Sequence, residues 1–434
     1  MSSPGRTAPR TGSAQARSTR PQDFLRGDTG VLAVLRRIHD LPVTSYYLVL
    51  AATLALTGIG LVMVLSASSI TSYAAGEGSS FSVVGRQAAF AVVGLLCMLG
   101  LSFVPLRGWR MIAPLAIIVG IALQVLPFIP GLGRTVNGST SWVSIGGIQG
   151  QPAEFVKAAL ALWLGVFLAN KAHRLRSLKE MLPAVLVLMA VLGFILYGRD
   201  LGTGLIIMGL ALGALFVGGV PWRHFLGALA MIGAVVALMV VTSANRMARV
   251  RAMLTGSDSA EMDPLGQHWQ SNHGLYALAS GGWFGVGLGA SREKWSWLPE
   301  AHNDFIFAII GEELGLLGSV VVLLLFAALG YGLVRIIMRS RDRFVQTSTA
   351  AVFMWIVGQA VVNIGVVAGV LPVIGVPLPL VSYGGSALLA TLIAIGMVLS
   401  FARAEEGARE AMRAQSNRVR SSLAVLARRP ARQK

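Results

Sequence analysis

Long apolar stretches recur along this sequence almost without interruption from Tyr46 to Phe401. A stretch of roughly 17–25 mainly apolar residues crosses the hydrocarbon core of a bilayer as one α-helix. In that core the backbone polar groups must be paired within the segment, so repeated stretches of this length predict a bundle of spanning helices. The expected spans are residues 46–66, 87–104, 111–130, 152–170, 182–197, 201–217, 224–242, 305–334, 348–371 and 386–401.

The charged residues are few and unevenly placed. They make up 13% of the chain, against 55% hydrophobic residues, whereas soluble domains carry about 25% charged residues. The net charge of +17 would suit a nucleic-acid-binding protein, but the cations gather in the two tails and in alternate loops. We therefore expect no nucleic-acid partner. With both tails in the cytoplasm, 27 Lys and Arg lie inside and eight lie outside, which obeys the positive-inside rule.

We expect an all-α, multi-pass protein of the cytoplasmic membrane with about ten transmembrane helices and both termini cytoplasmic. Its organisation is a basic tail at 1–45, a membrane domain at 46–402 and a second basic tail at 403–434. The outer loop at 243–303, between helices seven and eight, is far longer than the other connections, and such loops are usually functional or disordered. Because residues 1–45 lack the apolar core of a signal peptide, the first helix is expected to act as its own insertion signal.

Charges inside apolar helices are costly unless they are paired or face a wet cavity, so each one marks a candidate site. At the start of the fourth helix, Glu154 and Lys157 lie three residues apart and can pair on one face. Two interpretations stay open: an ion pair that pins this helix to its neighbours, or a polar group that contacts a substrate. Asp200 has a similar ambiguity. It either caps the sixth helix or lines a cavity below the headgroups, because both flanking helices are short.

The richest cluster of polar residues lies where the long outer loop enters the eighth helix. Glu300, His302 and Asp304 precede an apolar run that begins at Phe305. Apolar surroundings make a carboxylate a better proton acceptor, which suits a general base. A helix-capping role for Asp304 does not explain why so many titratable groups gather there.

Two further acids, Glu312 and Glu313, lie deeper in the eighth helix. If the helix runs unbroken from Asp304, Glu312 falls on the same face about 12 Å below it. A simpler interpretation is that one of the two acids neutralises Lys157.

The outer face also carries candidate anion-binding groups. Arg246, Arg292 and Lys294 lie in the long outer loop, and a basic pocket facing the headgroups suits a phosphate-bearing lipid. The competing interpretation is that long loops ignore the charge rule. Ser382 opens a Gly-rich turn at 382–386, and the exposed backbone N–H groups of such turns bind anions. No nucleotide-binding loop is present and the six histidines are scattered, so neither an ATP-driven pump nor a His/Cys metal site is expected.

Taken in order, the motifs resemble those of the SEDS proteins (shape, elongation, division and sporulation). The similarity covers about residues 45–403. Ser141 stands where the family has an arginine before Trp142, and Arg199 stands where it has a proline before Asp200. The motifs that carry the resemblance are Gln151-Pro152-x-Glu154-x-x-Lys157, Asp200-Leu201-Gly202-Thr203, the runs 279–289, 298–307 and 311–315, Asn363-Ile364-Gly365, Pro377-Leu378-Pro379 and 382–386.

The resemblance implies a ten-helix peptidoglycan glycosyltransferase that polymerises lipid II at the outer face of the cytoplasmic membrane. The chain is most similar to the division members, with actinobacterial features, which implies a septal location; the elongation type is the alternative. The family's essential aspartate corresponds to Asp304. The implied partners are lipid II, a polyprenyl-linked glycan, a class B penicillin-binding protein and other division proteins.

The implied reaction is an inverting displacement in which a sugar hydroxyl attacks a lipid-linked glycan and undecaprenyl diphosphate leaves. Asp304 is the expected base, and the leaving diphosphate needs positive charge, with or without a divalent cation such as Mg or Mn. Two alternatives stay open, a lipid II flippase and a non-catalytic scaffold. Glu312 and Glu313 are assigned as structural intramembrane charges, and the predicted substrate contacts are Glu154, Lys157, Asp200, Arg246, Arg292, Lys294, His302 and Ser382.

Overall fold

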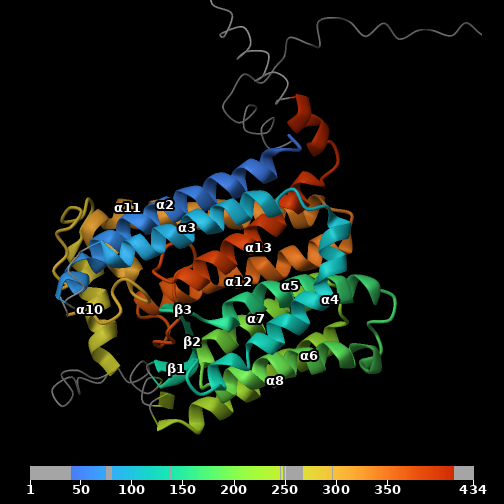
Figure 1. Cartoon of the computed structure of the whole chain (residues 1–434), viewed down its shortest axis with the longest axis horizontal. Coiled ribbons are helices and arrows are strands. Elements are labelled where there is room, and N and C mark those ends of the chain that lie inside the picture. Colours follow the sequence, from blue (N-terminus) through green and yellow to red (C-terminus); the bar gives the residue numbers. More distant parts are fainter. Residues whose placement is uncertain are drawn as a thin grey trace, which may run out of the picture.

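The fold is a bundle of long helices, seen in a computed structural model (Figure 1). The structure describes residues 41–74, 81–136, 138–244, 246–247, 250, 267–295 and 297–414. Most of both predicted basic tails, and residues 251–266 of the long outer loop, lie outside these ranges. The two ends of the described chain lie at the same end of the bundle, which requires an even number of spans.

Ten apolar helices form the bundle in the part of the chain that is described. Nine of them are long and apolar enough to cross a membrane, and the tenth, α7, is a shorter apolar helix of 17 residues. The prediction of a multi-pass, all-helical membrane fold is therefore confirmed. The spans are α2 (Thr44–Ala74), α3 (Ser82–Leu101), α4 (Leu106–Leu123), α5 (Pro152–Asn170), α6 (Leu178–Tyr197), α7 (Leu201–Val217), α8 (Trp222–Val241), α11 (Ile306–Arg339), α12 (Arg343–Val367) and α13 (Gly385–Arg403).

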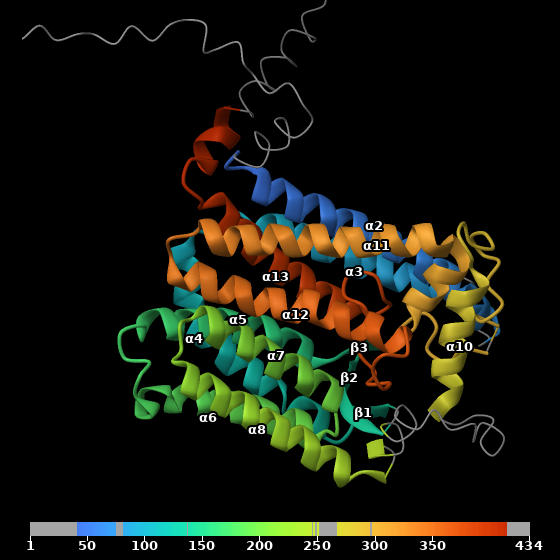
Figure 2. The ribbon, with the colours of Figure 1, turned by 180° about the vertical axis from the view of Figure 1, so that it is seen from behind.

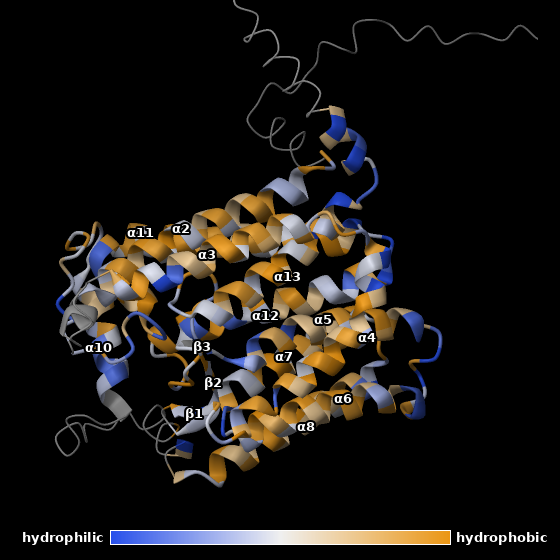
Figure 3. Ribbon diagram, in the orientation of Figure 1, coloured by the Kyte–Doolittle hydropathy of each residue, from blue (hydrophilic) through white to orange (hydrophobic). Residues whose placement is uncertain are grey.

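The helices differ greatly in how far they are enclosed. In α13, which packs against α2, α3, α5 and α12, 78% of the spanning window is buried, whereas α8 packs on α7 and buries none of its residues. Small residues permit the close approaches, as is usual in membrane bundles. A Cβ on Gly396 of α13 would lie 2.8 Å from the Met98 carbonyl oxygen of α3. Figure 3 shows apolar residues along the helices and hydrophilic ones mainly at the two ends.

The outer end of the bundle has its own small structures. A helix of 14 residues, α10 (Gln267–Ser280), crosses the ends of α11 and α12 (Figure 2). The segment before α5 forms an antiparallel sheet of β1 (Gly133–Val136), β2 (Ser139–Ile145) and β3 (Ile148–Gly150).

The register of the sheet places Arg134 opposite Trp142. Opposite residues of an antiparallel pair share a face, and neighbours along a strand alternate. Arg134 therefore lies on the face opposite to Ser141 and does not stand in for the arginine that the family pattern has at position 141.

The eighth span departs from the predicted continuous helix. The N-cap of α11 is Phe305, so Asp304 lies outside the helix, and the helix is broken at Gly315, where φ is 69° and ψ is −165°. This backbone conformation is essentially restricted to glycine. The prediction that Asp304 and Glu312 share one face of an unbroken helix is therefore wrong.

Candidate functional site

The backbone around Asp304 is held by three successive hydrogen bonds. The carbonyl oxygens of His302, Asn303 and Asp304 accept from the Tyr383 amide (2.9 Å), the Ser382 hydroxyl (2.6 Å) and the Asn363 side-chain amide (2.7 Å). We call residues 298–305 the Asp304 turn and residues 372–384 the proline loop. Neither segment forms regular secondary structure, so the bonds from Tyr383 and Ser382 fix their relative position, and the bond from Asn363 ties the turn to α12.

Both segments contain strained backbone. Glu300 in the Asp304 turn has φ of 56°, and Leu380 in the proline loop has φ of 66°. A non-glycine residue in this region costs of order 1–3 kcal/mol and persists only where the surroundings hold it. The Glu300 carbonyl accepts from the amides of Asn303 (3.0 Å) and Phe305 (3.3 Å). Strain of this kind gathers at sites where a side chain must be presented in one orientation.

Asp304 itself is half-buried at the outer end of the bundle, directly before the fully buried Phe305. Phe305 is the N-cap and makes no side-chain capping bond. One carboxylate oxygen of Asp304, Oδ2, lies 3.6 Å from the point that a Cβ on Gly375 would occupy. The carboxylate therefore faces the proline loop at a position without a side chain.

His302 and Ser382 support this arrangement. The His302 ring lies 5.5 Å from the Tyr383 ring, and burial lowers the pKa of His302, so the neutral imidazole is favoured. The buried Ser382 hydroxyl donates to Asn303 and accepts from the Leu378 amide at 2.8 Å. The expected anion-binding hydroxyl is thus engaged within the chain, and a substrate contact by either residue stays a prediction.

Gln87 is a site residue that the sequence interpretation missed. It is 1% exposed, its amide nitrogen donates to the Ser382 carbonyl at 3.1 Å, and its amide oxygen accepts from the Gly384 amide at 3.1 Å. It therefore ties α3 to the proline loop. The available signal was a lone glutamine in an apolar helix, since such polar residues usually face the bundle interior.

The pair on α5 also reaches the proline loop. Lys157 and Glu154 form a buried ion pair at 2.9 Å, and the Lys157 ammonium lies 4.8 Å from the centre of the Trp355 ring. Lys157 also donates to Gln359 at 3.3 Å, and Gln359 donates to the Pro377 carbonyl at 2.8 Å. The partner of Lys157 is Glu154, so the interpretation that an acid of the eighth helix neutralises it is wrong.

Asp200 caps α7. Its carboxylate accepts from the Thr203 backbone amide at 3.0 Å, the Thr203 hydroxyl at 2.9 Å and the Gln151 side-chain amide at 2.6 Å. The capping interpretation is the one observed, and the Gln151 bond also joins α7 to the start of α5. The cavity interpretation assumed two short flanking helices, but α6 has 20 residues.

The glycine-rich run of the outer loop repairs the break in α11. At a helix break, amides and carbonyls lose their partners within the helix. Gly282 and Trp283 accept from the amides of Leu316 and Leu317 at 2.9 and 3.2 Å, while Val286 donates to the Glu312 carbonyl at 2.9 Å. A Cβ on Gly315 would lie 2.3 Å from the Gly285 nitrogen, so this contact requires glycine.

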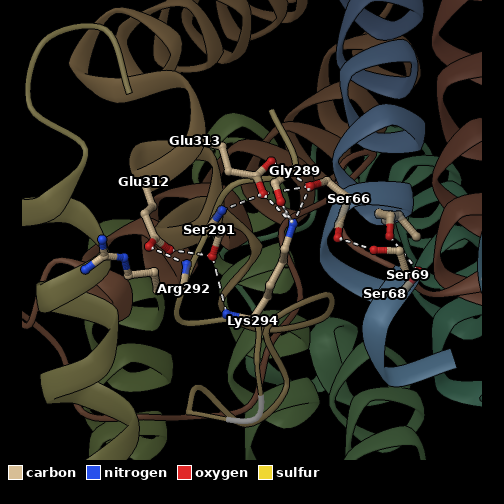
Figure 4. A network of polar contacts seen from close by, with 10 residues as sticks. Ser66, Ser68, Ser69, Gly289, Ser291, Arg292, Lys294, Glu312 and Glu313 are labelled. Atoms are coloured by element: carbon tan, nitrogen blue, oxygen red, sulfur yellow. Dashed lines mark hydrogen bonds and ion pairs between the residues drawn. The ribbon is translucent and has the colours of Figure 1, made fainter. Parts of the chain in front are cut away.

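A buried polar network lies beside the break (Figure 4). Lys294 pairs with Glu313 at 3.0 Å, and Ser66 of α2 donates to the same carboxylate at 2.6 and 2.7 Å. Glu312 accepts from the Ser291 hydroxyl at 2.5 Å and the Arg292 amide at 2.8 Å. The network joins the outer loop to α2 and α11, as the structural assignment of both acids requires.

Four of the predicted substrate contacts are cations and therefore candidates for the diphosphate: Lys157, Arg246, Arg292 and Lys294. Lys157 and Lys294 are buried in ion pairs, and the Arg246 guanidinium donates to the carbonyls of Met239 and Arg199, each at 3.2 Å. Arg292 is the one of the four with an exposed residue surface. Among the described residues, no group of three or more His, Cys, Asp or Glu is placed to hold a metal ion.

Known proteins share this architecture. The sequence model of the cell cycle protein family FtsW/RodA/SpoVE matches residues 47–407. The chain belongs to this family. Among FtsW/RodA/SpoVE proteins, the "probable peptidoglycan glycosyltransferase FtsW" of Mycobacterium tuberculosis is 41% identical over 86% of this chain and 70% of its own length. The stage V sporulation protein E of Bacillus subtilis is 38% identical over 82% of this chain and 96% of its own.

Solved structures of family members agree with the fold. A chain from a peptidoglycan synthase complex, described for its coordination of polymerisation and crosslinking, aligns with a TM-score of 0.65 at 28% identity, covering 82% of this chain and 96% of its own. Thermus thermophilus RodA, a rod shape determining protein, aligns with a TM-score of 0.59 at 28% identity over 82% and 96% of the two chains. The SEDS resemblance is thereby confirmed.

Proposed function

We propose that this membrane protein is a peptidoglycan glycosyltransferase that polymerises lipid II, with Asp304 as the general base. The observation that carries the proposal is the half-buried Asp304 carboxylate, which lies on a strained turn whose carbonyls at residues 302–304 are held by three hydrogen bonds, in a chain of the FtsW/RodA/SpoVE family. A base must be held in reach of one particular hydroxyl. Here the hydrogen bonds to the backbone carbonyls hold the Asp304 turn in place, so the surrounding fold determines how the turn is oriented.

The reaction forms a bond between a sugar 4-hydroxyl oxygen and the anomeric carbon of a lipid-linked glycan. Asp304 accepts the hydroxyl proton, and the bond from the anomeric carbon to the diphosphate oxygen breaks, so that undecaprenyl diphosphate leaves with both electrons. Among the four cations, Arg292 is our candidate for contact with that diphosphate, because it is exposed, whereas Lys157 and Lys294 are paired within the bundle and Arg246 donates to two backbone carbonyls. A divalent cation that assists the diphosphate stays a prediction.

The flippase alternative drew its support from charges deep in the membrane. Glu154 pairs with Lys157 and Glu313 with Lys294, each at 2.9 to 3.0 Å. These groups brace helices and the outer loop, and a transporter would instead use such groups near the midplane to bind its cargo. The geometry therefore favours the polymerase.

The division role, the septal location and a class B penicillin-binding protein as crosslinking partner belong to the same proposal. They are supported by the FtsW name of the mycobacterial relative and by the likeness to a chain of a peptidoglycan synthase complex.

The test is polymerisation of lipid II by the purified chain in detergent, with and without a crosslinking partner. We expect Asp304→Asn to lower the rate by at least about 100-fold, since a positioned base contributes 10²–10⁴. The matched control is Asp342→Asn, because Asp342 is likewise an aspartate close to the start of a span, where it is the N-cap of α12, but on the cytoplasmic side. Wild-type rates for Asp304→Asn would refute the base assignment, and lipid II transfer without polymer would favour the flippase.

A further inference from the structure

Asn363 joins the two segments that form the Asp304 site. It lies on α12 and is 2% exposed. Its side-chain nitrogen donates to the Asp304 carbonyl and to the Val376 carbonyl, both at 2.7 Å. One amide group therefore holds the Asp304 turn on one side and the proline loop on the other.

These two hydrogen bonds determine how the amide is oriented. Both neighbours are carbonyl oxygens and only accept, so the nitrogen, and not the oxygen, must face them. The side-chain oxygen Oδ1 is buried and has no hydrogen-bond partner among the described residues. An unpartnered buried acceptor opposes stability, so the contribution of the amide at this position lies in its two donated hydrogen bonds.

The other two hydrogen bonds to the Asp304 turn do not fix it to a helix. Tyr383 and Ser382 donate to His302 and Asn303 from within the proline loop, so they move with that loop. Asn363 acts from a continuous helix and fixes both segments to the bundle.

The position of the carboxylate depends on this link. Asp304 Oδ2 faces Gly375, the residue before Val376. The Asn363 amide thus holds the Asp304 carbonyl and the Val376 carbonyl, which lie on the two sides of the space occupied by the carboxylate. A change in the distance between these two carbonyls therefore changes the distance between the Asp304 carboxylate and Gly375.

We propose that Asn363 is the positioning residue for Asp304, which it serves by setting the distance between the Asp304 turn and the proline loop. This inference rests on the proposed role of Asp304 as the base. Asn363 does not touch the reacting atoms; it acts through the backbone of Asp304.

The test uses the purified full-length chain and two substitutions. Asn363→Leu keeps the branched shape and the number of side-chain heavy atoms and removes both donors, whereas Asn363→Gln keeps the amide but displaces it by one methylene. The control is Ser400→Ala, which removes a buried 2.7 Å bond from the Trp109 indole near the opposite end of the bundle. The measurements are kcat, KM and the pH–rate profile of lipid II polymerisation, together with thermal unfolding.

We expect Asn363→Leu to lower kcat by about 10-fold or more, because small misplacements of a catalytic group are costly. KM should stay within about twofold, and the acidic limb of the pH–rate profile should shift, since the surroundings of the base change. Asn363→Gln should fold like the wild type and show the same effects more weakly. Ser400→Ala should leave kcat and the profile unchanged.

Two results would overturn the proposal: a kcat and pH profile for Asn363→Leu that match those of Ser400→Ala, or a wild-type kcat for Asn363→Gln. If Asn363→Leu does not fold, the Gln variant decides alone. Asp304→Asn measured in parallel separates the possible failures. Full activity of Asp304→Asn removes the proposed function, whereas an inactive Asp304→Asn beside a fully active Asn363→Leu removes only the positioning role.

Discussion

Lys294 and Glu313 form a 3.0 Å ion pair beside the break in α11, with 2% and 0% of their side chains exposed. One residue comes from the outer loop and the other from the helix, so the pair anchors the loop to the bundle (Figure 4). Because Asp304 lies ten residues after Lys294, this anchor sets where the chain enters the Asp304 turn.

Removing one member of this pair should be strongly destabilising. Lys294→Met leaves the Glu313 carboxylate buried without its cation, and breaking a buried pair in this way costs about 3–5 kcal/mol. The double variant with Glu313→Leu should recover most of that loss, because no unpaired charge then remains. Unfolding in denaturant measures both. As a comparison, Lys171→Met disrupts the partly exposed Lys171–Glu180 pair and should cost much less, because solvent screens exposed charges; equal losses would show that Lys294 is not buried.

Gly315→Ala should abolish accumulation of folded protein. An alanine here would have to keep the backbone φ of 69°, and its Cβ would lie 2.3 Å from the Gly285 nitrogen. The backbone strain alone costs about 1–3 kcal/mol. The clash with Gly285 also pushes the outer loop away from the backbone groups of α11 that it hydrogen-bonds at the break. Gly58→Ala in α2 is the control, since nothing lies within 4 Å of its Cβ position. Yield and thermal unfolding of the purified protein decide, and a well-folded Gly315→Ala protein would contradict the close approach.

Gly375→Ala should lower activity more than stability. Its Cβ would lie 3.6 Å from Asp304 Oδ2, and φ is 77° at this exposed position. The added methyl group narrows the space that an incoming hydroxyl needs, so we expect a loss in kcat/KM of about 10-fold or more. Gly131→Ala shares the positive φ of 86° with open space around it and should retain activity. Parallel losses in the two variants would mean that backbone strain, and not the contact, is responsible.

His302 should make the site sensitive to acid. Burial lowers the pKa of His302 below its usual 6.5, so between the folded pKa and 6.5 the unfolded chain binds more protons. Its stabilising contribution is therefore complete above pH 6.5 and is lost as the pH falls towards the lowered folded pKa.

The measurement is thermal unfolding of the wild type and His302→Gln between pH 5 and 8. The wild type should lose stability below pH 6.5 relative to His302→Gln, which lacks the titrating ring. His273, which pairs with Glu293, provides a control substitution, His273→Gln. If the two His variants had identical pH dependence, the effect would not belong to the Asp304 turn.

The membrane fold was accessible from the sequence because it depends on local and additive properties. Each span is long and apolar enough to be recognised alone, as with residues 152–170 and 201–217, which are predicted and observed with the same limits. The resemblance to the SEDS family came from ordered motifs, and the ion pair of Glu154 and Lys157 followed from their spacing on one helix face.

The sheet before α5 was not predicted because β1 and β3 have only four and three residues, and the seven residues of β2, STSWVSI, do not alternate between apolar and polar side chains. The break at Gly315 was also missed. A glycine within a long apolar run is compatible with a continuous helix, and what breaks this one is the loop that packs against it.

What the sequence by itself determined is which residues carry charge, how many times the chain crosses the bilayer, and that Asp304 stands at the entrance of the eighth span. Only the tertiary structure decided the long-range partners: Lys294 with Glu313, and Asn363 between Asp304 and Val376. The reason is physical. Helix formation in lipid follows from short-range hydrogen bonding and apolar length, whereas the pairing of buried polar groups depends on how residues more than a hundred positions apart, such as Gln87 and Ser382, are brought together by packing.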